Sequence, residues 1–380
     1  MVNSKIALYL LQKQSLIKPQ KKSHYLEILK DHLGLHSTDN LTPYLSLWSR
    51  IEDFDPEHLF NAINQHQALL KRAYRGTVFV IHKSILSLII DSSEYFTLNW
   101  VKGFVKYSVK EEFDIDFYKQ KIITQFQVGN QFTVNELKKV IDIDKKGDFL
   151  SLFLRYLELE GTLVRAPQKY ITENIINYGL LNDFYPDLKE EKMSSDKAIS
   201  SLLKFYINQY GPISIDDFCW WLPLTKTKTK EVLEMIKDDL IDLTFDNREC
   251  LMTKEDFNKF EKFDETLDEP IINFLPYEDH FPKAYTNRSW FLSQENLKYL
   301  YEVGRLELGQ LRPSIWLNNE IIGRWEIDYL DSKKISAEVS IKYLDKNRTK
   351  SDEIQTKINQ RKKELEEFLN TKLLPLANER

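Results

Sequence analysis

The stretch that decides the fold is Ala68-Leu-Leu-Lys-Arg-Ala-Tyr-Arg-Gly-Thr-Val-Phe-Val-Ile81, whose pattern predicts two strands around a glycine-containing turn. The residues before it show helical spacing of apolar side chains over 6–16 and 23–33, and again after Pro43 and after Pro56. Helices followed by a hairpin are typical of a winged helix, the helix-turn-helix variant with a β-ribbon wing.

The same order of elements recurs in the next hundred residues. Thr133 and Glu136 can form a capping box at the start of a helix, and Gly161 stands where a second helix should end. The expected elements are helices over 134–141 and 148–160 and strands over 162–165 and 169–172. This order predicts a second winged helix.

A third set of these elements follows, and the pattern then changes to strands. The third set has helices over 200–210 and 229–240, a helix that opens at Ser214, and strands over 243–245 and 250–252. From about residue 270, the expected elements are a hairpin with strands over 311–317 and 321–327, a third strand over 335–343 and a helix over 352–373. Strands covered by one helix indicate a small β-barrel-like domain.

The predicted fold class is therefore α+β, with tandem winged-helix (helix-turn-helix) domains followed by a C-terminal β-barrel-like domain with a terminal helix. We expect the first winged helix, which carries the candidate active-site segment, over residues 1–105. The other expected domains are a second winged helix over 106–190, a third over 191–265, and the C-terminal domain over 266–380.

Composition is that of a globular protein of several domains. Of the 380 residues 42% are hydrophobic, and with only 11 glycines and 12 prolines there is little room for long disordered segments. The two cysteines, Cys219 and Cys250, lack partners at metal-ligand spacing, so we expect reduced core thiols and no metal site. No apolar run reaches the length of a membrane span or a signal peptide, which favours a cytoplasmic protein.

The net charge of −5 argues at first against a nucleic-acid partner, but the basic residues are clustered. One basic cluster lies in the first predicted hairpin and consists of Lys71, Arg72 and Arg75. A second lies at the start of the helix predicted over 229–240 and consists of Lys226, Lys228 and Lys230. Such clusters are compatible with contacts to DNA phosphates, although each also suits a solvated surface.

A candidate site lies in Leu33-Gly-Leu-His-Ser-Thr-Asp-Asn-Leu-Thr-Pro-Tyr-Leu-Ser-Leu-Trp-Ser-Arg50. His36, Thr38 and Asp39 end a short apolar run, and a helix that Thr42 can cap follows at once. Residue types alone favour a plain turn in which these side chains satisfy backbone groups. The alternative is a polar cluster, held by a packed helix, that binds a water or a substrate atom.

Several blocks of the chain resemble the winged-helix DNA glycosylases related to AlkZ and YcaQ. In the first half of the chain the matching blocks are Gly34-Leu-His-Ser-Thr, Pro43-Tyr-Leu-Ser-Leu-Trp-Ser-Arg50, Arg75-Gly-Thr-Val and Tyr156-Leu-Glu-Leu-Glu-Gly-Thr-Leu-Val-Arg165. In the second half they are Tyr210-Gly-Pro212, Asp217-Phe-Cys-Trp220, Phe274-Leu-Pro276, Tyr285-Thr-Asn-Arg288 and Pro313-Ser-Ile-Trp-Leu-Asn-Asn-Glu-Ile-Ile-Gly-Arg-Trp325. They occur in the same order over nearly the whole chain.

The resemblance implies a bacterial DNA-repair enzyme that removes N7-alkylated or crosslinked bases, including interstrand crosslinks, by hydrolysing the N-glycosidic bond. It implies a monofunctional hydrolase in the cytoplasm, associated with the nucleoid, with double-stranded DNA as partner and no cofactor. Family members carry Gln-x-Gln or Gln-x-Asp at the catalytic positions, where this chain has His36 and Thr38. Our hypothesis is that His36 orients or activates water, Thr38 orients it, and Asp39 stabilises the sugar cation.

The candidate DNA contacts are Arg50, Lys71, Arg72, Arg75, Lys226, Lys228 and Arg324. The competing interpretation is a non-catalytic winged-helix DNA-binding protein or regulator, and a protein-interaction scaffold is a third class. A regulator would usually be a symmetric dimer that reads paired half-sites. Three different winged helices in one chain favour a monomer that clasps one DNA segment.

Overall fold

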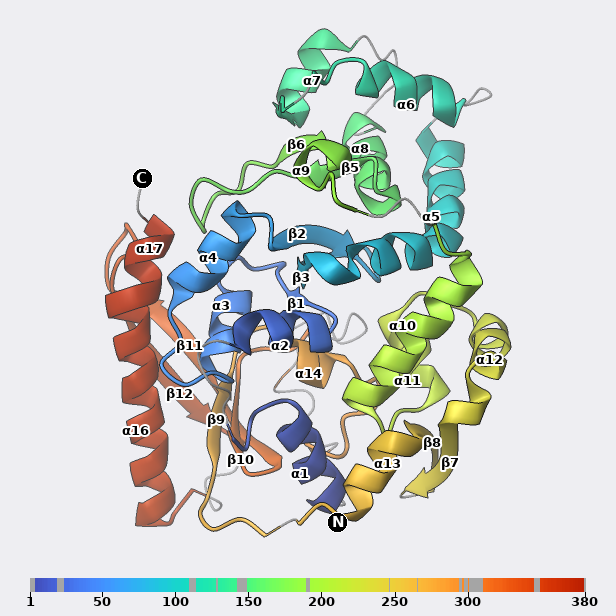
Figure 1. Ribbon diagram of the computed structural model, residues 1–380. Coiled ribbons are helices and arrows are strands. Elements are labelled where there is room, and N and C mark those ends of the chain that lie inside the picture. Colours follow the sequence, from blue (N-terminus) through green and yellow to red (C-terminus); the bar gives the residue numbers. More distant parts are fainter. Residues whose placement is uncertain are drawn as a thin grey trace.

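The computed structural model describes residues 4–18, 24–108, 114–127, 129–141, 149–188, 192–245, 247–264, 266–293, 296, 300, 310–344 and 349–378. Within these residues the fold is mixed α+β, with helices and four small antiparallel sheets (Figure 1). None of the helices within these ranges is both long and apolar enough to cross a membrane.

The first part of the chain confirms the predicted helices followed by a hairpin. Its elements are α1 Ser4–Lys13, α2 Tyr25–Asp31, β1 Leu35–His36, α3 Thr42–Trp48, α4 Pro56–Asn64, β2 Ala68–Ala73 and β3 Thr77–His82. The short strand β1 was not predicted, and it pairs with β3 so that the sheet order is β1-β3-β2. Its pairing places His36 opposite Phe79.

Gly34 explains how β1 can approach β3. Its φ is +96°, a backbone conformation that favours glycine. A Cβ at this position would lie 2.7 Å from the Ile81 side chain and 3.0 Å from the Val80 carbonyl oxygen. The predicted cap at Thr42 was wrong, because the N-cap residue of α3 is Leu41 and the Thr42 hydroxyl donates to the Tyr277 carbonyl instead.

A second group of elements forms a lobe with its own apolar core, at the top of Figure 1. Its elements are α6 Ile115–Ile123, β4 Phe132–Thr133, α7 Val134–Val140, α8 Phe149–Glu160, β5 Leu163–Arg165, β6 Asn177–Leu180 and α9 Leu181–Phe184. The helix α5 Leu86–Ser108 leads into this lobe, but its buried residues Leu86, Leu88 and Ile89 belong to the larger apolar core below it. The capping box of Thr133 and Glu136 is confirmed. The strand predicted over 169–172 was wrong: these residues form turns, and the partner of β5 is β6.

The third group of elements packs against the first and shares an apolar core with it. Its elements are α10 Ser195–Tyr210, α11 Ile215–Trp221, α12 Lys226–Glu234, the 3-10 helix η3 Lys237–Asp239, β7 Leu240–Phe245, β8 Arg248–Thr253 and α13 Lys254–Glu261. Thr225 caps α12, so this helix begins and ends earlier than the sequence predicted. One buried apolar cluster joins Phe79 of β3, Tyr206 of α10, Trp221 of α11 and Phe281.

The C-terminal strands form an open sheet. The elements are β9 Ile272–Leu275, α14 His280–Lys283, β10 Ser314–Leu317, β11 Glu320–Tyr329, β12 Ala337–Tyr343, α16 Asp352–Phe368, the π-helix η5 Leu369–Leu373 and α17 Leu374–Asn378. The strand order is β12-β11-β10-β9, and the described residues contain no closed barrel, contrary to the barrel-like prediction. At the edge strand β12, the backbone N–H groups of Ala337 and Val339 donate to the side chains of Asn370 and Glu366 instead of to another strand.

Candidate active site around His36 and Glu278

A cavity of about 250 Å³ lies where the first hairpin, α11 and α14 meet. Its walls come from segments more than 200 residues apart in sequence, and they are both aromatic and ionisable. The lining includes His32, His36, Thr38, Tyr74, Arg75, Phe79, Tyr210, Trp220, Trp221, Glu278, His280 and Lys283. Two of the three predicted catalytic residues, His36 and Thr38, therefore meet in one cavity.

His36 is buried in the wall of this cavity. Its Nε2 lies 3.3 Å from the Thr38 hydroxyl oxygen and 3.9 Å from a Glu278 carboxylate oxygen. Burial lowers the pKa of His36 well below its usual range, and the nearby Lys283 charge adds to this effect. The imidazole is therefore neutral near pH 7, and in the tautomer with hydrogen on Nδ1 its Nε2 can accept a proton from water.

Glu278 and Lys283 form a buried ion pair next to His36. One Glu278 carboxylate oxygen accepts a hydrogen bond from the Leu311 backbone N–H at 2.6 Å, and the other contacts the Lys283 ammonium. Burial, together with the charges of Arg75 and Arg288, lowers the pKa of Lys283 to about 7. The cavity thus holds a carboxylate and an amine that can exchange a proton.

Asp279 fixes the segment that carries Glu278. Both of its carboxylate oxygens accept hydrogen bonds from the Arg50 guanidinium, at 2.8 and 2.9 Å, and one also accepts from the Ser46 hydroxyl at 2.9 Å. Arg50 is 0% exposed. The prediction that Arg50 contacts DNA is therefore wrong, because its guanidinium is sequestered by a bidentate ion pair under the cavity.

Arg75 and Trp220 lie together at the cavity. The Arg75 guanidinium stacks 3.9 Å from the centre of the Trp220 ring, and the indole N–H donates to the Lys283 carbonyl at 3.1 Å. Arg75 is exposed, so its cation is available to a ligand that enters here, with the half-buried Trp220 ring stacked against it. Its neighbour Trp221 is instead a core residue, stacked on Tyr206.

Asp39, the third predicted catalytic residue, does not line the cavity. It is exposed, and its carboxylate accepts a hydrogen bond from the Leu41 backbone N–H at 2.9 Å. Burial raises the pKa of the Tyr329 phenol on β11, and the charge of Asp39 raises it further. Asp39 therefore lies apart from His36 and Thr38 in the structure, and the carboxylate beside His36 belongs to Glu278.

The basic residues of the first hairpin have structural partners. Lys71 is 1% exposed and its ammonium donates to the backbone carbonyls of Glu158 and Leu159 on α8. The Arg72 guanidinium lies 3.5 Å from the Glu158 carboxylate. The predicted DNA contact by Lys71 is wrong, because this lysine is buried between β2 and α8, and Arg72 is largely engaged in the same network.

The remaining predicted contacts lie on other surfaces. Lys226 is exposed and pairs with Asp216, while Lys228 pairs with Asp196 and Glu231. Arg324 lies on β11, 3.8 Å from the Glu326 carboxylate. None of these three lysine and arginine side chains lines the cavity around His36.

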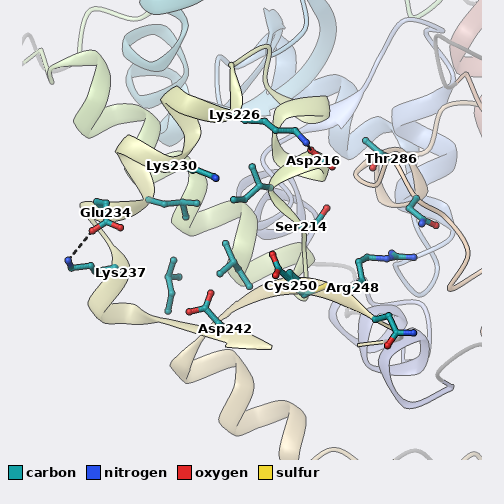
Figure 2. A pocket seen from close by; sticks show the side chains of 17 residues that line it. Ser214, Asp216, Lys226, Lys230, Glu234, Lys237, Asp242, Arg248, Cys250 and Thr286 are labelled. Carbon is teal, nitrogen blue, oxygen red and sulfur yellow. Dashed lines mark hydrogen bonds and ion pairs between the residues drawn. The ribbon is translucent and has the colours of Figure 1, made fainter. Parts of the chain in front are cut away.

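A second hollow, open and about 800 Å³ in volume, lies between α12 and the β7–β8 hairpin (Figure 2). Figure 2 shows the Lys226–Asp216 and Glu234–Lys237 pairs near its rim. Lys230 and Arg248 also line it. Asp242 and Glu249 line it too, so the hollow holds four basic and four acidic side chains. Its basic side chains are of the types that contact DNA phosphates.

Sequence reasoning missed Glu278, His280 and Lys283. His280 packs against His32, with 2.7 Å between its Nε2 and the Nδ1 of His32, and burial lowers the pKa of both rings. The available signal was the run Glu278-Asp-His280, three ionisable residues between the blocks 274–276 and 285–288 that resemble the family. Within the described residues, no cluster of histidine, cysteine and acidic side chains is arranged to hold a metal ion.

Comparisons with known proteins agree with the early resemblance. The sequence matches the family described as DNA glycosylase AlkZ-like over residues 29–342. Among solved structures, the fold is similar to that of Streptomyces sahachiroi DNA glycosylase AlkZ, with a TM-score of 0.76 and 15% sequence identity over 99% of this chain and 97% of that chain. A comparison with curated proteins gave no match. The structural likeness shows a shared fold, and the family match extends over most of the chain.

Proposed function

The chain belongs to the AlkZ-like DNA glycosylase family, and we propose that it excises alkylated bases from duplex DNA, with the cavity around His36 and Glu278 as active site. The observation that carries this proposal is the close placement of a neutral imidazole and a buried carboxylate in one cavity. The lesion class we propose is N7-alkylguanine, including bases crosslinked between strands. We also propose that the protein acts as a monomer at the bacterial nucleoid.

The chemistry of glycosidic cleavage needs the two groups that this cavity supplies. The departing base leaves an oxocarbenium-like sugar, which a carboxylate such as Glu278 stabilises electrostatically in a site of low dielectric. N7-alkylguanine is already cationic and leaves readily, so placing the water is the main remaining task. His36 accepts a proton from that water through Nε2, and the Thr38 hydroxyl orients it.

We further infer that residues 1–105, 106–190 and 191–265 act as tandem winged helices and that residues 266–380 complete the surface that faces DNA. The hollow beside α12 supports contact with the phosphate backbone through Lys226, Lys230 and Arg248. Arg75, stacked on Trp220, is the candidate contact nearest to the lesion.

The proposed backbone contact predicts a change in salt dependence. In the variant in which Lys226, Lys230 and Arg248 are all replaced by Gln, duplex affinity should fall and its dependence on salt should become shallower. The slope of log affinity against log salt should decrease by about 0.9 for each phosphate contact removed. Fluorescence anisotropy with undamaged duplex at several salt concentrations measures both effects, and Lys259→Gln, an exposed lysine on α13, is the control. An unchanged slope would exclude the hollow as a phosphate-binding surface.

The proposed activity is tested by release of the damaged base. Wild-type protein incubated with duplex that contains N7-methylguanine should generate abasic sites well above the spontaneous rate. His36→Ala should reduce the single-turnover rate by about 100-fold or more, because the water loses its proton acceptor. Duplex binding without any release of the base would favour the second candidate, a non-catalytic DNA-binding protein. The observation that favours this candidate is that His36 and Thr38 replace the residue types usual at the family's catalytic positions.

A further inference from the structure

We propose that Lys283 is a nucleophile that forms a covalent imine with an abasic sugar in this cavity and thereby cleaves the DNA strand. This inference rests on the proposed function for the location of the sugar, and it adds a lyase activity to base release. It differs from the monofunctional hydrolysis that the family resemblance implies.

The first argument is the position of the Lys283 amine. Its side chain is the last of α14 and lines the cavity that also holds His36 and Thr38. The side chain is 15% exposed, so a sugar that enters the cavity can reach it, whereas Glu278 behind it is almost completely buried. The hydrogen bond from Trp220 to the Lys283 carbonyl holds the end of this helix in place.

The second argument is the proton acceptor beside the Lys283 amine, the carboxylate of Glu278. An imine forms only from a neutral amine, and the Glu278 carboxylate in direct contact can take the proton from the Lys283 ammonium. This transfer converts a buried ion pair into two neutral groups, so burial lowers the free-energy cost of the transfer. The lowered pKa of Lys283, about 7, agrees with a ready supply of neutral amine. Glu278 cannot turn away, because its other oxygen is held by the Leu311 N–H.

The reaction balances with these two side chains alone. The Lys283 amine adds to C1′ of the ring-opened abasic aldehyde, and the resulting hydroxyl leaves as water with the proton that Glu278 holds. The product is a protonated imine beside a regenerated Glu278 carboxylate. The carboxylate then removes a proton from C2′, the C3′–O bond breaks, and the 3′ phosphate leaves with that electron pair. Hydrolysis of the imine returns the free amine and an unsaturated aldehyde.

The test uses the full chain and a duplex with a preformed abasic site, so that no base has to be released first. With sodium borohydride present, wild-type protein should become covalently attached to the DNA, since the imine is reduced to a stable amine. Mass spectrometry of the attached peptide should identify Lys283. Lys13 is an internal control, because it is also buried and paired with a carboxylate, Asp256, but lies outside the cavity.

The matched variant is Lys283→Arg, which keeps the positive charge beside Glu278 but cannot form an imine. Trapping should fall by about 100-fold or more in this variant, and thermal unfolding checks that it folds. No trapping by the wild type, attachment to Lys13 or another lysine, or undiminished trapping by the variant would each overturn the proposal. Because the abasic site is preformed, the two proposals can fail separately. Trapping without release of N7-methylguanine would support the imine and contradict the proposed glycosylase function. Release without trapping would support the glycosylase function and contradict the imine.

Discussion

Replacing Glu278 with Gln is expected to slow release of N7-methylguanine by about 10²- to 10³-fold in single turnover. Gln has nearly the same shape and can still accept a hydrogen bond from the Leu311 N–H through its carbonyl. What it lacks is the negative charge beside His36, which we propose stabilises the sugar cation. The effect should therefore appear in the rate of base release and leave the affinity for undamaged duplex nearly unchanged.

The control for this prediction is Glu52→Gln, which removes an exposed carboxylate and should leave the rate unaltered. Circular dichroism and thermal unfolding establish that the Glu278 variant is folded, which matters because the variant leaves the Lys283 ammonium without its carboxylate partner. If this variant released the base at the wild-type rate, Glu278 would have no part in the chemistry.

Asp279→Ala should lower the free energy of unfolding by about 3–5 kcal/mol, the usual range when one partner of a buried ion pair is removed. The variant would leave the Arg50 guanidinium fully buried without its bidentate partner, and the Ser46 hydroxyl would lose its acceptor. The Phe281 backbone N–H at the start of α14 would lose its cap as well. Chemical denaturation followed by tryptophan fluorescence measures the loss.

A matched comparison for Asp279→Ala is Asp216→Ala. Asp216 also pairs with a basic residue, Lys226, but the pair is exposed, so solvent screens it and its removal should change stability far less. Similar small losses in both variants would mean that the Asp279–Arg50 pair does not support the site. The account predicts instead that α14, with Lys283 at its end, depends on this pair for its position.

The local elements were predictable from sequence, because each is encoded by neighbouring residues. The first hairpin follows from two short apolar runs on either side of the turn at Gly76, and α7 follows from the capping box of Thr133 and Glu136. Strand β1 was missed because its two residues become a strand only through pairing with β3. The 169–172 strand was predicted wrongly because its apolar pattern has no partner strand in that segment.

The site was only half predictable, since its polar groups come together by tertiary packing. His36 and Thr38 stand close in sequence and could be identified together, but Glu278 reaches His36 from more than 200 residues away. Lys71 and Arg50 show the opposite case, in which basic residues that suggest DNA contacts are paired inside the fold. The sequence around a basic residue does not reveal whether the folded chain will place a carboxylate or a backbone carbonyl against its side chain.

The most direct test of the central claim compares two abasic-site analogues in duplex DNA, a cationic pyrrolidine that resembles the charged sugar and a neutral tetrahydrofuran. An active site that stabilises an oxocarbenium-like sugar should bind the cationic analogue at least about tenfold more tightly. This preference should disappear in Glu278→Gln, while binding of the neutral analogue changes little. Equal affinity of the wild type for the two analogues, or a preference that survives in Glu278→Gln, would contradict the assignment of this cavity as a glycosylase active site.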